Sequence, residues 1–234
     1  MNTMNRNGSL LYPLEGGIDL QSIMRQVYTW MVLGMLITAG VAYVTANTSL
    51  ITLAANPILL LIAVVAEFGV VLVISRGLSR LSSGVATALF IVYAALNGFT
   101  LSIVLLAFSI GSVFLAFVAT AALFGVMSVI GYTTRVDLSK MGTYLMMAVI
   151  GLIIAMVINL FVNSSLMDML VSIAGVLIFT ALTAYDTQRI GRMAAEMNLT
   201  GEAGAKFGIL GALKLYLDFI NMFLFMLRLT GRRR

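Results

Sequence analysis

Long apolar runs separated by short polar segments dominate the chain. Each run is close to the roughly 20 residues that an α-helix needs to cross the hydrocarbon core of a bilayer. Seven such runs occur, at about 27–46, 57–75, 84–108, 110–132, 141–162, 166–185 and 207–230. This pattern predicts an all-α integral membrane protein with seven transmembrane helices.

The polar segments at the two ends complete the expected organisation. Residues 1–26 lack the short basic stretch, apolar run and small-residue cleavage site of a signal peptide, so we expect a retained N-terminal tail. Residues 27–230 form the expected seven-helix transmembrane domain. Residues 231–234 form a basic C-terminal tail.

Composition agrees with a membrane protein and narrows the possible chemistry. Hydrophobic residues make up 61% of the chain and charged residues 10%, and the mean hydropathy is +1.08, which excludes an ordinary soluble domain. The chain has neither cysteine nor histidine, so carboxylates are the groups expected to respond to pH near neutrality. No P-loop motif occurs, and the sequence indicates no cofactor.

Lysine and arginine occur in alternate connections between the runs. Basic residues precede the first run and follow the second, fourth and sixth, whereas the connections after the first, third and fifth contain none. Because basic residues favour the cytoplasmic side, we expect the N-terminus to be cytoplasmic. The net charge of +5 is then a topology signal rather than evidence of nucleic-acid binding.

The last run conflicts with this rule, because a seventh crossing places Arg232, Arg233 and Arg234 outside. The residues alone leave two arrangements open. Either the run crosses in spite of its basic tail, or it enters the membrane and returns on the cytoplasmic side. A re-entrant segment is tolerated only where it is buried in protein or faces water.

The last run also contains two ionisable residues, Lys214 and Asp218. A charge in the middle of a membrane is costly unless it is paired or wetted. Because the two residues are four positions apart, they share a helix face and can pair with each other. The alternative is a lysine that extends to the interface beside a structural carboxylate, but we interpret the two residues as part of a functional site.

Other polar residues lie within the runs or at their ends. Glu67 lies near the middle of the second run and Arg76 at its end, on opposite helix faces, so that each needs a partner elsewhere. Asp186 ends the sixth run, where a solvated helix end is an equally good interpretation. Asn97 and Thr100 are expected to form hydrogen bonds between helices.

Three stretches together resemble a known family. They are AYDTQ at 184–188, ALKLYLDFIN at 212–221 and GYTTRVDLS at 131–139. With them the chain resembles the Bax inhibitor-1 family of membrane proteins, in particular its bacterial branch, over nearly its whole length after the N-terminal tail.

The resemblance implies a fold, an activity and a location. The implied fold has a central C-terminal helix wrapped by the other six, which favours a seventh crossing. The implied activity is a pH-sensitive leak of calcium or other cations through the bacterial inner membrane. The implied partners are the lipid bilayer, the permeant cation and possible other membrane proteins. The resemblance makes Asp186 and Asp218 a joint pH sensor, with four supporting residues: Glu67, Arg76, Lys214 and Asn221.

The chemistry of two such aspartates is consistent with that activity. Two carboxylates close together in a poorly solvated site cannot both ionise easily, so the pair retains a proton. When that proton is lost, the two negative carboxylates repel each other, form an ion pair with Arg76 or bind a cation. Calcium prefers about six to eight oxygen ligands, so Asp186 and Asp218 are expected to form only a weak transit site for this metal, as conduction requires.

Two other classes of function fit parts of the pattern. An intramembrane aspartyl protease uses two aspartates, and Tyr185-Asp186 matches half of the presenilin-type pattern. The other half, Gly-x-Gly before the second aspartate, is absent ahead of Asp218, so we do not expect an enzyme. A non-conducting regulatory partner, for example a modulator of a membrane quality-control protease, can use the same helices and is the alternative to a channel.

Overall fold

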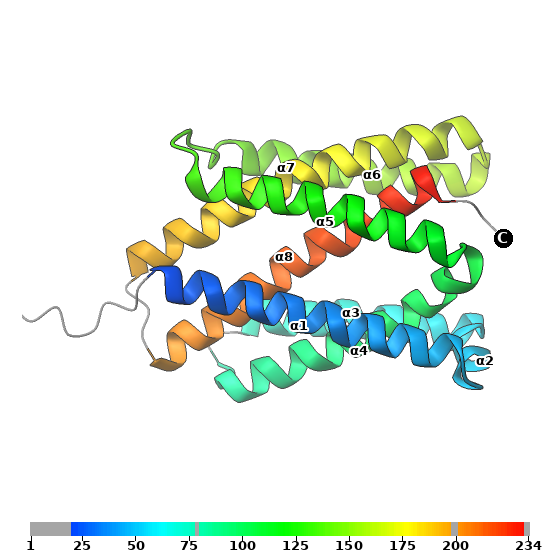
Figure 1. The fold of residues 1–234 in the computed structure, drawn as a ribbon, viewed down its shortest axis with the longest axis horizontal. Helices are drawn as coiled ribbons and strands as arrows, with labels where there is room; N and C mark the ends of the chain where they lie inside the picture. Colours follow the sequence, from blue (N-terminus) through cyan, green and yellow to red (C-terminus); the bar gives the residue numbers. More distant parts are fainter. Residues whose placement is uncertain (1–19, 78–79, 198–200, 232–234) are drawn as a thin grey trace, which may run out of the picture.

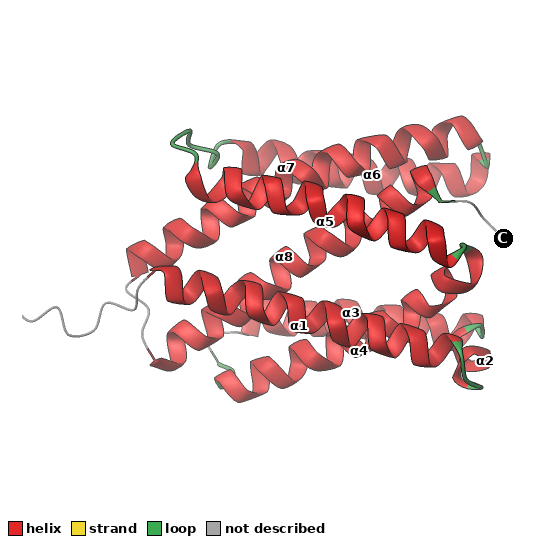
Figure 2. Ribbon diagram, viewed as in Figure 1, coloured by secondary structure: helices red, strands yellow, loops and turns green. Residues whose placement is uncertain are grey.

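The computed structural model describes residues 20–77, 80–197 and 201–231. These residues are mostly helical, and no strand occurs among them (Figure 2). All the described helices except the short α2 are long and apolar enough to cross a membrane, which confirms the predicted fold class. In chain order the helices are α1 (Leu20–Ala46), α2 (Leu50–Ala54), α3 (Pro57–Gly77), α4 (Ser83–Ala107), α5 (Ile110–Thr133), α6 (Met141–Val162), α7 (Ser165–Met197) and α8 (Gly201–Thr230).

Several helix ends differ from the prediction. Helix α1 begins at Leu20, inside the segment 1–26 that was expected to be a tail, and residues 1–19 lie outside the described part of the chain. Helix α7 continues to Met197 and α8 begins at Gly201, so most of the connection after Asp186 is helical. The reason is that apolar runs mark the membrane crossing, whereas backbone hydrogen bonding can continue into the polar interface.

Local sequence explains other helix ends. Ser82 Oγ accepts a hydrogen bond from Val85 N at 3.3 Å and caps α4. Ser109 Oγ accepts from the backbone N of Ser112 at 3.3 Å and caps α5 in the same way. Asn163 ends α6 in the left-handed conformation, with φ of 51°. The predicted breaks between the runs 84–108 and 110–132, and between the runs 141–162 and 166–185, are therefore confirmed.

Helix α8 runs diagonally through the bundle (Figure 1). In its most apolar window 67% of residues are buried, against 11% for α3 and for α6. It packs closely on α1, α4, α5 and α7, whereas α3 packs mainly on α4 and α6 on α7. The central place of the C-terminal helix is supported, but four neighbours rather than six make its main contacts.

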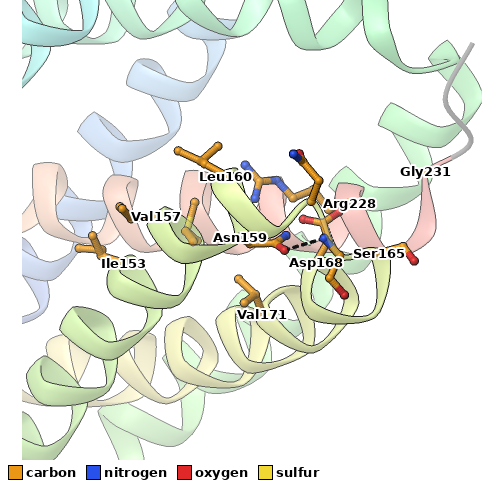
Figure 3. Close-up of a pocket in the computed structure, with 12 residues that line it drawn as sticks. Ile153, Val157, Asn159, Leu160, Ser165, Asp168, Val171, Arg228 and Gly231 are labelled. Atoms are coloured by element: carbon orange, nitrogen blue, oxygen red, sulfur yellow. Dashed lines mark hydrogen bonds between the residues drawn. The ribbon is translucent and has the colours of Figure 1, made fainter.

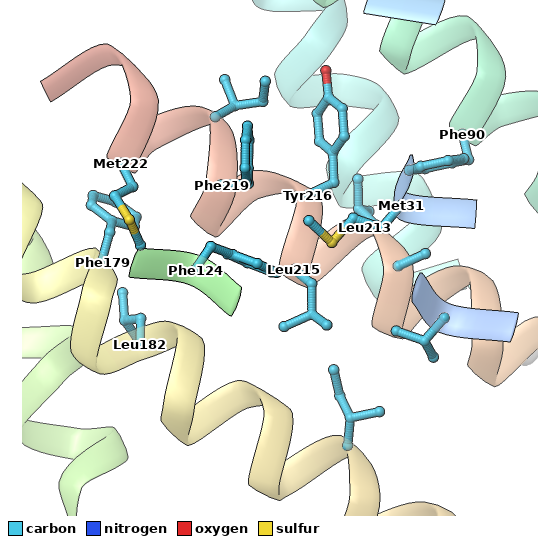
Figure 4. Close-up of a cluster of buried hydrophobic side chains, with 14 of the residues drawn as sticks. Met31, Phe90, Phe124, Phe179, Leu182, Leu213, Leu215, Tyr216, Phe219 and Met222 are labelled. Carbon is cyan, nitrogen blue, oxygen red and sulfur yellow. The ribbon is translucent and has the colours of Figure 1, made fainter. Parts of the chain in front are cut away.

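Side chains of α8 form the centre of the apolar core (Figure 4). Tyr216 is fully buried. Its ring meets those of Phe90 and Tyr93 edge to face, with centroids 5.9 and 5.7 Å apart. Phe219 makes a similar contact with Phe124 at 5.5 Å. The core therefore joins α4 and α5 through the central helix.

Two glycines allow the closest approaches between helices. A Cβ on Gly98 of α4 would lie 2.6 Å from the carbonyl oxygen of Thr38 on α1. A Cβ on Gly131 of α5 would collide with the backbone of Ala184 on α7. Small residues at these positions let the helix backbones touch, as is usual in membrane bundles.

The basic connections gather at one end of the bundle, here called the basic end. The start of α1, the α3–α4 and α5–α6 connections, the end of α7 and the start of α8 lie there (Figure 1). Helix α2, the α6–α7 turn and the end of α8 lie at the other end, here called the opposite end. The predicted basic tail is described only at Gly231, and Arg232, Arg233 and Arg234 lie outside the described residues.

Candidate functional site

The two aspartates singled out from the sequence lie on two helices that pack on each other, α7 and α8. Asp186 on α7 is 7% exposed and Asp218 on α8 is 5% exposed. Asp186 and Lys214 are the charged groups that act electrostatically on Asp218. No hydrogen bond joins the two carboxylates among the described residues, and Asp218 Oδ2 is buried without a partner.

Lys214 pairs with a different aspartate from the one expected. Its Nζ lies 3.2 Å from Asp186 Oδ1, so the ion pair joins α8 to α7 rather than linking Lys214 to Asp218 along one helix. The i,i+4 pair that the spacing allowed is not the ion pair that forms, because tertiary packing brings the α7 carboxylate within reach of Lys214. Asp186 is not a solvated helix end, since α7 continues past it and buries it.

A cavity of about 400 Å³ lies beside this ion pair. We call it the basic-end cavity. Its polar lining includes Ser139, Asp186, Arg189 and Lys214, and apolar residues of α6 form much of the remainder. The Asp186–Lys214 pair is therefore accessible from the basic end, whereas Asp218 does not line this cavity.

Glu67 lies deeper in the membrane and forms hydrogen bonds with α4. Thr100 Oγ1 donates to Glu67 Oε1 at 2.8 Å, and Asn97 Nδ2 donates to Glu67 Oε2 at 3.4 Å. This confirms the interhelical role expected for Asn97 and Thr100. The Glu67 carboxyl group therefore accepts hydrogen bonds from neutral donors and not from Arg76. This agrees with the prediction that Glu67 and Arg76 lie on opposite faces of their helix.

The same hydrogen-bond network extends to α8 and α1. Tyr216 OH donates to Asn97 Oδ1 at 3.2 Å and lies 2.6 Å from Thr38 Oγ1. Thr38 Oγ1 can also donate to the carbonyl oxygen of Ala94 at 2.9 Å. The two hydroxyl groups have only two protons for these three contacts, so the network has more than one proton arrangement. Sequence reasoning missed Tyr216 and Thr38, although both are polar groups within apolar runs.

A second cavity, of about 510 Å³, lies next to Glu67 and is here called the mid-bundle cavity. Helices α3 and α4 line one side, α6 and α7 line the other, and α8 forms its floor. It exists because α3 and α6 do not pack closely on α8. Asn221 also lines it, but Asn221 Nδ2 donates to the carbonyl oxygen of Leu217 on its own helix at 2.8 Å.

Arg76 is not part of this arrangement. Its side chain is exposed near the end of α3 and lines a shallow hollow with Arg80. Within the described residues it has no ion pair with either aspartate. The described part of the chain also contains no group of three or more acidic side chains that could hold a metal ion.

The sequence stretches 131–139 and 184–188 are connected by hydrogen bonds at the basic end. Gln188 accepts from Leu138 N at 2.9 Å and donates to the carbonyl oxygen of Val136 at 2.8 Å, which ties the α5–α6 connection to α7. Arg192 forms an ion pair with Asp137 at 2.5 Å. Hydrogen bonds from Ser139, first from its backbone N–H, and then from Arg192 lower the pKa of Asp137 to about 2. Residues 131–139 and 184–188 are therefore neighbours in space as well as shared features of the sequence.

Comparison with known proteins gives a consistent result. The family model described as inhibitor of apoptosis-promoting Bax1 matches residues 20–234. An inner membrane protein, YbhL, of Escherichia coli K12 is 42% identical over 237 residues, with both chains fully covered. An uncharacterized protein of Deinococcus radiodurans is 45% identical, with 92% of each chain covered. One of Borreliella burgdorferi is 44% identical, with 89% of this chain and 91% of the relative covered.

Proposed function

The chain belongs to the Bax inhibitor-1 family of membrane proteins, and on that basis we propose that it is a pH-sensitive leak channel for calcium or similar cations in the bacterial inner membrane. Asp186 and Asp218 are its proton-sensing residues in this proposal. Positive residues at the basic end favour the cytoplasmic side for that end and for the N-terminus.

The observation that carries the proposal is a series of cavities along α6 and α8. The mid-bundle cavity and a third cavity of about 740 Å³ at the opposite end share Ile153, Met156 and Arg228. The basic-end cavity is the next along α8, since Lys214 lines it and Leu217 lines the mid-bundle cavity. Three residues of helix correspond to a rise of about 4.5 Å, and in this proposal the side chains at this level form the barrier between the two spaces.

The ionisable residues lie at that barrier. Lys214 pairs with Asp186 there, and buried Asp218 is one helical turn further along α8. In the proposed mechanism a proton bound by the two aspartates keeps α7 and α8 together. When the proton leaves, repulsion between the two carboxylates separates α7 from α8 and opens the barrier. The exposed carboxylate oxygens then bind the passing cation weakly, as conduction requires.

Flux through purified protein in liposomes tests this proposal. We expect calcium to enter protein-containing vesicles faster than empty ones, with a steep dependence on external pH near neutrality. Asp218→Asn and Asp186→Asn should each abolish the steep pH dependence, and the double variant should add little, because the two residues titrate as one unit. Asp137→Asn is the matched control, since it removes an exposed carboxylate at the same end of the bundle.

Two results would contradict the proposal. If vesicles with protein leak no faster than empty ones at any pH from mildly acidic to mildly alkaline, the protein does not conduct and the regulatory-partner alternative takes its place. If the two single variants each shift the pH profile and the shifts add, the carboxylates titrate independently and do not form a sensor.

A further inference from the structure

The mid-bundle cavity and the cavity of about 740 Å³ at the opposite end, here called the opposite-end cavity, are adjacent, and we call the two together the α6–α8 groove. Both cavities are lined by Ile153, Met156 and Arg228, so they follow each other along α6 and α8 toward the opposite end. Neither Asp186 nor Asp218 lines it. Both cavities are part of the proposed cation pathway, and Glu67 and Asn221 line the inner one.

The inner section of the groove is mainly apolar, with polar groups from Glu67 and its hydrogen-bond partners on α4 at one side. Helices α3 and α6 flank it without packing closely on each other. Phe68 on α3 is 67% exposed and Ile153 on α6 is 54% exposed, although both line the cavity. Further lining residues are mainly leucine, valine, methionine and phenylalanine. A hydrocarbon chain is the ligand that suits a lateral opening of this composition.

The outer section is polar and contains both signs of charge (Figure 3). Arg228 lies in the last turn of α8, and Asp168 lies in the first turn of α7. Asn159 lies beside them, with its Oδ1 accepting from Ser164 N at 3.0 Å, which fixes the α6–α7 turn at the rim. These residues are at helix ends, and therefore at the depth of lipid headgroups.

The charged groups suit a particular class of headgroup. The Arg228 guanidinium lies 5.7 Å from the centre of the Phe225 ring, and a planar guanidinium is the side chain best matched to phosphate oxygens. The Asp168 carboxylate can accept hydrogen bonds from an ammonium group. A cationic and an anionic residue at one mouth match a zwitterionic headgroup better than one with net negative charge.

We propose that the α6–α8 groove binds one phospholipid with a primary-ammonium, zwitterionic headgroup, such as phosphatidylethanolamine. Its phosphate contacts Arg228, its ammonium contacts Asp168, and one acyl chain lies along the apolar section between α3 and α6. The lipid comes from the leaflet at the opposite end of the bundle. The two cavities also belong to the proposed cation pathway, so a bound lipid would obstruct that pathway. The binding experiment itself does not require that the protein conducts ions.

Lipid binding to the purified full-length chain tests the proposal. The protein in detergent is mixed with phosphatidylethanolamine, phosphatidylcholine or phosphatidylglycerol of identical acyl chains, and bound lipid is counted by native mass spectrometry. We expect one tightly bound phosphatidylethanolamine, weaker phosphatidylcholine because its trimethylated nitrogen has no N–H donor, and the weakest binding for phosphatidylglycerol. Glycerophosphoethanolamine and inorganic phosphate at the same concentration should not compete, because they lack the acyl chains.

Three variants separate the contacts. Arg228→Gln should weaken all three lipids about tenfold or more, since a charge-assisted contact is lost. Asp168→Asn should weaken phosphatidylethanolamine and remove its preference over phosphatidylglycerol. Ile153→Trp leaves both charges in place and fills the groove, so it should weaken all three lipids equally. Arg192→Gln is the control, because it removes an exposed arginine at the basic end.

Each outcome decides the proposal. Equal binding of the three lipids to the wild type, or unchanged binding in both Arg228→Gln and Ile153→Trp, overturns it. Competition by glycerophosphoethanolamine or phosphate as strong as by the intact lipid also overturns it, and assigns the mouth to a soluble ligand. If Arg228→Gln does not fold, Ile153→Trp and the competition experiment still give the answer.

Discussion

Replacing Tyr216 by phenylalanine tests whether the polar network in the core holds α1, α4 and α8 together. The change removes one oxygen and keeps the ring, so the edge-to-face contacts with Phe90 and Tyr93 are retained. Two hydrogen-bond contacts are lost, to Thr38 at 2.6 Å and to Asn97 at 3.2 Å. Because Tyr216 is fully buried, water cannot replace them.

The expected loss of stability follows from these contacts. Hydrogen bonds between membrane helices contribute about 0.6 kcal/mol on average and up to about 1.7 kcal/mol, and a buried group left without a partner adds to the loss. We therefore expect Tyr216→Phe to lower the free energy of unfolding by about 1–2 kcal/mol. Tyr144→Phe is the matched control, since Tyr144 is 72% exposed, and it should change stability by less than about 0.5 kcal/mol.

A double-mutant cycle with Thr38→Val isolates the shorter contact. Unfolding of the four proteins is measured with a denaturing detergent titrated into mixed micelles. We expect a coupling energy of about 0.5–1.5 kcal/mol between positions 38 and 216. If the effects of the two single variants add, or if Tyr216→Phe is as stable as Tyr144→Phe, the network does not contribute to the packing of these helices.

Four further predictions follow from other parts of the structure. Gly131→Ala should destabilise the protein by at least about 1 kcal/mol in the same detergent titration, because its Cβ meets the Ala184 backbone; Gly125→Ala on the same helix has open space, and equal losses in both would contradict the proposed close contact. Lys214→Gln should move the pH midpoint of cation flux in liposomes upward, because a positive charge no longer favours loss of the shared proton; an unchanged midpoint would exclude this role. The stabilising effect of Asp137 should be fully present above its unfolded pKa of 3.8 and be lost as pH falls through about 2, so the melting temperatures of wild type and Asp137→Asn should converge on acidification. In the cysteine-free chain, Ser49→Cys should react with an impermeant thiol reagent added to intact cells and Ser139→Cys only after lysis; the reverse result would invert the proposed topology.

The sequence alone determined the transmembrane helices and their order. Hydropathy along one segment is a local property that the bilayer selects directly, so the runs at 84–108, 110–132 and 141–162 match α4, α5 and α6 closely. The sequence also separated Glu67 from Arg76, because helix periodicity fixes which residues of one helix share a face. The ends of α7 and α8 were misjudged, since these helices extend beyond the apolar runs into polar sequence.

Only the tertiary structure decided which polar groups meet. Lys214 has Asp218 four residues away in its own helix, yet it pairs with Asp186 on α7. Glu67 finds its donors on α4, and Tyr216 joins them from α8. Such partners depend on the relative depth and rotation of packed helices, which small residues such as Gly98 and Gly131 control through backbone contact. The groove beside α6 likewise forms because α3 and α6 do not pack closely on α8. Such a space depends on how several helices pack together, so the sequence of any one apolar run cannot predict it.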